Sequence, residues 1–317
     1  EEPELNRGTI FFRSMKTNAA RAKDIMMVKS TWATQIAFLL ERDIVYPDTD
    51  IPCIPDEFCS SPEYSEEEIE DIASFVRNTW KLGNGPISNM SRLLESHGII
   101  IATIKTGLNE TDACSCYIGS RAFIFLDMEK ECAVRTRFNL AHELGHLILH
   151  GEVTQHDIED KKKLKQIEEE ANRFASCFLL PRDSFLYDVR STSLQSFLYL
   201  KRKWKVSIQA MVYRCKELNL FSENQMIYIN KQISARRWRK LEPYDIEWPC
   251  ESITILPTAV KMLIDRGDYS KEEFVSQFRI PGKDIEELCS LPAGYFSPEE
   301  KNAILIDFSS IKKTYDR

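Results

Sequence analysis

The residue types that could carry out chemistry gather in one short run, His142-Glu143-Leu144-Gly145-His146, in which the two histidines are four positions apart. On a helix both imidazoles therefore project from one face, about one turn apart, where a single Zn²⁺ ion can take a nitrogen from each. Glu143 would then lie beside the ion and take a proton from a water molecule that the metal activates. The run predicts a metal-dependent hydrolase that attacks a carbonyl group, with Glu143 as general base.

The flanking residues decide between this hypothesis and a surface helix with solvated histidines. They are apolar at four positions: Leu140, Leu144, Leu147 and Ile148. A buried helix whose imidazoles had no partners would cost several kcal/mol, and metal coordination supplies such partners. We therefore predict a buried helix from Thr136 to Leu149, ended by Gly151.

A catalytic zinc ion usually has three protein ligands and a fourth position for water, so a third ligand must follow the two histidines. The extended metzincin pattern is excluded, because Glu152 stands where its third histidine belongs and Leu149 where its glycine belongs. A second pattern takes a glutamate from the next helix, and here there are three candidates: Glu168, Glu169 and Glu170. The apolar periodicity of that helix places Glu169 on the opposite side and the other two at the flanks of the buried stripe. Periodicity leaves the choice between these two flanks open.

Two stretches carry a likeness to a known family. They are the run from Arg137 to His150 (RFNLAHELGHLILH) and the run from Glu170 to Ala175 (EANRFA), which Leu179-Leu180-Pro181 follows. Together they closely resemble the ImmA/IrrE family of metallopeptidases. Three further stretches are similar to members of that family and extend the resemblance to residues 65–295: Gly83 to Ile87, the strand pair that ends at Asp127, and Trp238 to Pro243. In that family the glutamate directly before the alanine of the second helix is the third zinc ligand. The resemblance therefore implies the ligand set His142, His146 and Glu170.

The resemblance also implies a function. Family members commonly cleave or inactivate a helix-turn-helix repressor, which releases genes for stress response or mobile-element transfer. The first hypothesis is a zinc endopeptidase that acts on such a partner repressor, in stress response or in mobile-element or toxin–antitoxin regulation. The second is a non-catalytic regulatory or toxin-like module that binds protein and has a structural or vestigial metal site. Many relatives carry an N-terminal helix-turn-helix domain, and because the chain begins at Glu1 without an initiator Met, we expect contact with DNA only through such a domain upstream.

Hydrophobic periodicity predicts an α+β fold with a small sheet. Helices are expected over four ranges besides the histidine helix: Ala19 to Arg42, Ser65 to Gly83 with a capping box at Ser65 and Glu68, Ser88 to Ser96, and Leu164 to Leu180. Strands are expected over three: 99–104, 113–118 and 122–126. The resemblance adds that the core is thermolysin-like. We divide the chain into an N-terminal helix and linker (1–62), a metallopeptidase core (63–183) and a mainly helical C-terminal domain (184–317).

Several further residues have alternative interpretations. Tyr117, on the strand before the histidine helix, is a candidate catalytic residue that donates a hydrogen bond to a developing oxyanion. His150 either orients a metal ligand, binds substrate or caps the helix. Asn172 is expected to bond locally or to solvent, with support of a metal ligand as the alternative. Cys114-Ser115-Cys116 is interpreted as an ordinary strand segment. The basic run from Arg236 to Lys240 is interpreted as a solvated helix end, with contact to phosphate or to an acidic partner as the alternative.

Composition argues against other classes of protein, namely nucleic-acid-binding, membrane-anchored and secreted proteins. The net charge of −7 and pI near 5.5 argue against nonspecific nucleic-acid binding by the chain as a whole. No apolar run approaches the roughly 20 residues that a membrane helix needs, so we predict no membrane anchor. Nine cysteines, an odd number, without a signal peptide favour the reducing cytoplasm.

Overall fold

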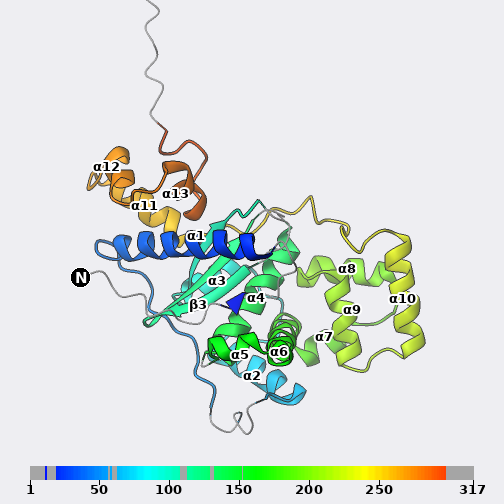
Figure 1. The fold of residues 1–317 in the computed structure, drawn as a ribbon. Helices are drawn as coiled ribbons and strands as arrows, with labels where there is room; N and C mark the ends of the chain where they lie inside the picture. The colour runs from blue at the N-terminus through cyan, green and yellow to red at the C-terminus, as the bar shows by residue number, and fades with distance from the viewer. Residues whose placement is uncertain are drawn as a thin grey trace, which may run out of the picture.

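The computed structural model describes residues 11–12, 19–55, 58, 63–107, 113–128, 132–151 and 153–297. A small mixed sheet lies at its centre with helices around it (Figure 1). Within the described residues it has the strand order β1-β3-β4-β2. The strands are β1 (Phe11–Phe12), β2 (Ile100–Ile104), β3 (Ala113–Ile118) and β4 (Arg121–Asp127).

The strand pairings explain the order. β3 and β4 form the predicted antiparallel hairpin, and Gly119 turns the chain with a φ of +61°, a region that favours glycine. β2 lies parallel to β4, and β1 pairs antiparallel with β3, so that Phe12 lies opposite Cys114. The three predicted strands are confirmed, whereas β1 was not predicted.

Alternate residues of each strand point to opposite faces of the sheet, and each face has its own hydrophobic core. On β4, Ile124 and Leu126 join the core that contains the histidine helix. Phe123 and Phe125 join the opposite core. The sheet is therefore buried on both faces.

Three groups of helices surround the sheet (Figure 1). The face that bears the candidate site packs against α2 (Glu66–Thr79), α3 (Met90–Ser96), α4 (Ala133–Leu149) and α6 (Lys161–Leu179), with α5 (Gln155–Glu159) beside α6. The other face packs against α1 (Ala19–Leu40), α11 (Ile255–Asp265), α12 (Lys271–Ser276) and α13 (Gly282–Leu288). The third group, to one side, contains α7 (Arg182–Asp188), α8 (Leu194–Trp204), α9 (Ile208–Glu217) and α10 (Glu223–Ala235).

This architecture confirms the predicted α+β class, with a small sheet, a histidine helix and a mainly helical C-terminal region. The capping box at Ser65 is present, with Glu68 accepting from the Ser65 backbone amide. No helix in the described part of the chain has the length and apolar character to cross a membrane. The predicted division of the chain into three parts, at residues 62/63 and 183/184, stays a prediction. Phe197 and Trp204 of α8 extend the same core that contains α4 and α6.

The crossing of α4 and α6 fixes the relation between the two helices. Gly145 lies at the contact, where an added Cβ would come within 3.1 Å of Phe174 Cδ1 and 3.3 Å of the Ala171 Cα. A Cβ at these distances is tighter than ordinary van der Waals contact, so Phe174 or the α6 backbone would have to move by a few tenths of an ångström. The absence of a side chain at Gly145, with the small Ala171 on the other side, therefore favours the close crossing of the two helices.

Candidate metal centre

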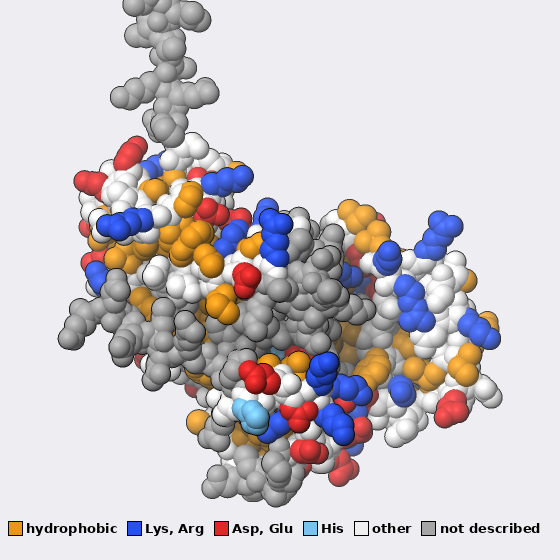
Figure 2. All heavy atoms as spheres, in the orientation of Figure 1, with side chains coloured by type: hydrophobic (Ala, Val, Ile, Leu, Met, Phe, Trp, Pro, Cys, Tyr) orange, Lys and Arg blue, Asp and Glu red, His pale blue; other side chains and the backbone are white. Residues whose placement is uncertain are grey.

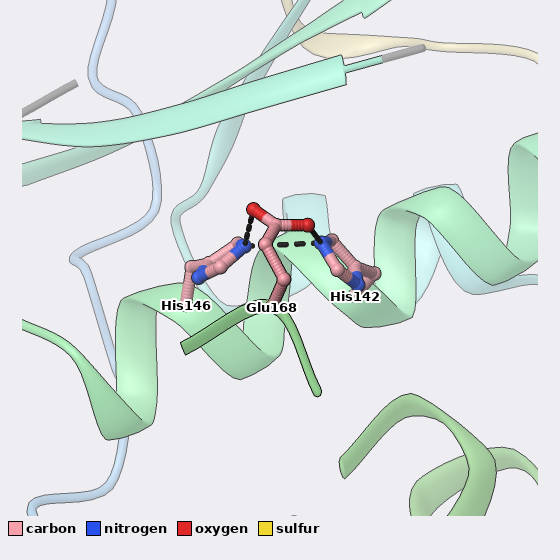
Figure 3. A group of neighbouring side chains, drawn as sticks. All are labelled: His142, His146 and Glu168. Atoms are coloured by element: carbon pink, nitrogen blue, oxygen red, sulfur yellow. Dashed lines mark hydrogen bonds and ion pairs between the residues drawn. The ribbon is translucent and has the colours of Figure 1, made fainter. Parts of the chain in front are cut away.

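Two helices bring three candidate ligands together (Figure 3). His142 and His146 come from successive turns of α4, and Glu168 comes from α6. The Nε2 atoms of the two histidines are 3.0 Å apart. Glu168 places Oε2 3.5 Å from His142 Nε2 and Oε1 3.5 Å from His146 Nε2. Of the described residues, these three form a group whose ligand atoms all lie within 4.8 Å of one another.

The far nitrogen of His142 is held by Asn172. The Asn172 Oδ1 atom lies 3.1 Å from His142 Nδ1, while Asn172 Nδ2 donates to the Glu168 backbone carbonyl at 2.7 Å. Because the amide nitrogen is already used as a donor, the amide oxygen must accept from His142 Nδ1–H. With the hydrogen on Nδ1, His142 can present the lone pair of Nε2 to a metal ion between it, Glu168 and His146.

A longer chain of contacts holds His146. Its Nδ1 atom lies 3.1 Å from His150 Nδ1, and His150 Nε2 lies 2.9 Å from Glu170 Oε2. A carboxylate accepts, so His150 donates from Nε2 and its Nδ1 accepts from His146 Nδ1–H. This leaves a lone pair on His146 Nε2. Burial lowers the pKa of His146 to about 3, which keeps the ring neutral.

The centre therefore collects three electron-pair donors: His142 Nε2, His146 Nε2 and the Glu168 carboxylate. Acceptors brought this close repel one another unless a cation lies between them. In a tetrahedral zinc site with bonds of about 2.0 to 2.1 Å, two ligand atoms are roughly 3.3 Å apart. The two Nε2 atoms are 3.0 Å apart, and each lies 3.5 Å from a different oxygen of the Glu168 carboxylate. These distances lie on either side of the tetrahedral value, and with one oxygen from Glu168 the three ligand atoms are all within 4.8 Å of one another. The residues fit a zinc ion, in a His₂Glu donor set that leaves a fourth position for water or substrate.

The structure does not place Glu170 with the two histidines, where the resemblance put it. Its side chain instead accepts from Gln166 Nε2 at 2.8 Å and from the Tyr64 backbone amide at 3.3 Å, in addition to His150. Glu168, which periodicity placed on the other flank of the buried stripe, faces the imidazoles of His142 and His146. Glu170 supports the centre indirectly, because it sets the hydrogen bonding of His150 and hence of His146.

Two supporting residues were missed or only partly foreseen from sequence. Asn172 was expected to bond locally, and it does so through Nδ2, but its Oδ1 also orients His142. The spacing could have shown this, because Asn172 is four residues after Glu168 and so on the same helix face. For His150 the first of the three alternatives agrees with the geometry, although it also terminates α4.

Glu143 is held by a residue of the sheet. Ser115 Oγ on β3 lies 2.6 Å from Glu143 Oε2, and the Glu143 side chain is buried beside the two histidines. A hydroxyl that donates to one carboxylate oxygen fixes the orientation of that carboxylate. This role of Ser115 was not predicted from sequence, although strand alternation puts Ser115 on the same face of the sheet as Tyr117.

Tyr117 itself lies against the end of the histidine helix. Its hydroxyl donates to the Leu147 backbone carbonyl at 3.3 Å, and burial raises its pKa to about 12. The hydrogen needed for the predicted oxyanion contact is therefore used within the fold, and that role stays a prediction. Cys114 and Cys116 face the opposite core, in agreement with their interpretation as strand residues.

A cavity of about 680 Å³ lies beside the centre, between α2, α6 and α9. Its wall includes Glu170, Asn172 and Phe138. The first two residues also hold the histidines, so a molecule in this cavity would touch the shell that supports the ligands. The ligand side chains themselves are nearly enclosed, with His142 4% and His146 1% exposed.

A histidine pair on one helix, a glutamate on the helix that crosses it and a small mixed sheet define a metallopeptidase-like domain of the zincin class. Residues 94–216 match the family model described as the IrrE N-terminal-like domain. The match confirms the predicted resemblance over these residues, which include every residue of the centre, and supports a metallopeptidase-like segment. The remainder of the predicted range 65–295 lies outside the match. A search of curated proteins found no match.

Proposed function

We propose that the chain is a zinc-dependent endopeptidase with His142, His146 and Glu168 as metal ligands and Glu143 as general base. The observation that carries the proposal is the convergence of two imidazole lone pairs and one carboxylate, separated by 3.0 to 3.5 Å, next to a second, buried carboxylate. A bound zinc ion would supply Lewis-acid activation of water and of the scissile carbonyl.

The protein residues supply orientation and proton transfer. Asn172 fixes the His142 ring, and the Glu170–His150 pair fixes the His146 ring, so both Nε2 atoms point to one position. Ser115 holds one oxygen of Glu143. Glu143 would take the proton of the attacking water and deliver it to the leaving amine nitrogen.

The proposed substrate is a partner helix-turn-helix repressor, in stress response or in mobile-element or toxin–antitoxin regulation. Support for this substrate comes from the family match alone. An alternative function is a non-catalytic regulatory or toxin-like module that binds protein, with a structural or vestigial metal site. The near-complete burial of His142, Glu143 and His146 favours this alternative, because an endopeptidase must admit a peptide to its metal.

One comparison separates the two functions. Wild type and Glu143→Gln would be purified in parallel, assayed on a quenched fluorescent peptide library and analysed for metal by elemental mass spectrometry. The peptidase proposal requires cleavage by wild type, a loss of at least about 100-fold in Glu143→Gln, and about one zinc per chain in both. Glu169→Gln, on an exposed side chain of the same region, is the matched control and should keep full activity. Equal behaviour of wild type and Glu143→Gln would support the binding module.

A further inference from the structure

The group of helices beside the peptidase core is strongly basic. Residues 194–240, which contain α8, α9 and α10, include eleven Lys and Arg residues but only two Glu and no Asp. The chain as a whole has a net charge of −7, so this segment differs in sign from the rest. Figure 2 shows Lys and Arg side chains gathered over these helices, with few acidic side chains among them.

Most of these cations are exposed and have no acidic partner. Lys201 and Arg214 are buried in ion pairs with Glu242 and Glu70. Nine others are exposed: Arg202, Lys203, Lys205, Lys216, Lys231, Arg236, Arg237, Arg239 and Lys240. Lys203 pairs with Asp188, and no ion pair joins any of the remaining eight to a described acidic residue. Of the two glutamates, Glu217 has a buried side chain, which leaves Glu223 as the exposed acid of the segment.

The surface is also hollowed. A groove of about 810 Å³ lies along α9 and α10. Its lining includes three cations, one acid and several apolar or neutral polar side chains; the cations are Lys216, Lys231 and Arg239, and the acid is Glu223. Arg239 is held in place, because Nε donates to Ser234 Oγ at 3.0 Å and Nη2 donates to Asn230 Oδ1 at 3.2 Å. The groove therefore has three cations, one of them fixed in orientation.

Aromatic side chains are interleaved with the cations. Tyr199, Tyr213 and Tyr228 are 70%, 53% and 64% exposed, which is unusual for tyrosines that only stabilise a core. They come from α8, α9 and α10 respectively. The Lys216 Nζ atom of the groove lies 5.9 Å from the centre of the Tyr213 ring. Exposed aromatic rings on the same helices as exposed cations are features with which proteins bind nucleic-acid strands.

We propose that the α8–α10 surface binds the phosphate backbone of a nucleic acid. Eight uncompensated cations on one small helical unit create a local positive field that the net charge of the chain conceals. An acidic protein is the other possible class of partner. It is disfavoured because the core of a protein interface is depleted of charge, whereas here three cations and only one acid are among the residues that line the groove.

The test is fluorescence anisotropy of the full chain with labelled 20-nucleotide DNA, single- and double-stranded, and with RNA of the same length. Binding that involves about five phosphates should weaken roughly 100- to 1000-fold between 50 and 200 mM salt. The double variant Lys216→Glu/Lys231→Glu should lose at least about 10-fold in affinity and show a shallower salt dependence. The strand or duplex preference identifies which nucleic acid the surface suits.

A matched control reverses two exposed lysines elsewhere, Lys261 on α11 and Lys283 on α13. The Lys261→Glu/Lys283→Glu variant has the same net charge as the test variant and should bind as wild type. Equal losses in both variants would overturn the proposal, as would no binding to any nucleic acid at 50 mM salt or tighter binding to 20-residue polyglutamate. Lys216→Gln/Lys231→Gln repeats the test without charge reversal, in case the glutamate variant unfolds. Glu143→Gln should bind nucleic acid as tightly as wild type does. The nucleic-acid result therefore does not depend on whether the peptidase proposal fails.

Discussion

Three adjacent glutamates give a sharp test of the metal centre, because the structure assigns each a different role. Glu168 faces both histidine Nε2 atoms, Glu170 contacts His150, and Glu169 pairs with Lys165 on the exposed side of α6. Substituting each by glutamine removes one negative charge and keeps the size of the side chain. The three variants therefore differ only in position along less than one helical turn.

The expected losses in zinc affinity follow from the distance of each residue to the donor atoms. Glu168→Gln removes a ligand, so the loss should exceed about 100-fold, the upper limit typical for residues that only orient ligands. Glu170→Gln acts through His150 and His146, so the loss should be about 10- to 100-fold, which corresponds to roughly 1.4 to 2.8 kcal/mol. Glu169→Gln should leave the affinity unchanged, since its exposed pair with Lys165 contributes little.

Competition with a chromophoric zinc chelator measures all three affinities, and circular dichroism checks that each variant is folded. The order of losses, Glu168 before Glu170 before Glu169, is the prediction. If Glu170→Gln lost the metal while Glu168→Gln kept it, the ligand assignment implied by the family resemblance would be correct and the assignment from geometry would be wrong. Equal, small losses at all three positions would mean that the centre does not use a carboxylate ligand.

Two further variants test the supports of the centre. Gly145→Ala should push α6 away from α4, because the new Cβ would lie 3.1 Å from Phe174 Cδ1 and 3.3 Å from the Ala171 backbone; we expect a loss of about 1 to 3 kcal/mol in the free energy of unfolding, measured by urea denaturation, together with weaker zinc binding. Tyr117→Phe removes the hydrogen bond to the Leu147 carbonyl, so unfolding should become easier by about 1 kcal/mol. If Tyr117 has no oxyanion role, kcat on the peptide library stays unchanged, whereas a fall of 10-fold or more would establish the predicted role.

The elements of the fold could be predicted where local signals determine them. Ser65 and Glu68 form a capping box through contacts within one helical turn, and the β3–β4 hairpin follows from strand alternation around Gly119. β1 could not be predicted, because a two-residue strand has no periodicity and exists through its pairing with β3. The basic surface of α8–α10 could not be predicted from the net charge of −7, because that value averages a basic segment with an acidic remainder.

The histidine pair was predictable because four-residue spacing on one helix is local, but the choice of the third ligand depended on how two helices cross. Residues two apart on a helix point about 200° away from each other, so Glu168 and Glu170 cannot both face α4. In the structure Gly145 of α4 lies against Ala171 of α6. Glu168 precedes Ala171 by three residues and shares its face, whereas Glu170 is rotated about 100° from it and reaches His150 at the end of α4. The glycine between the two histidines thus carries information about the third ligand, since the small residue packed against it identifies the side of α6 that faces the metal.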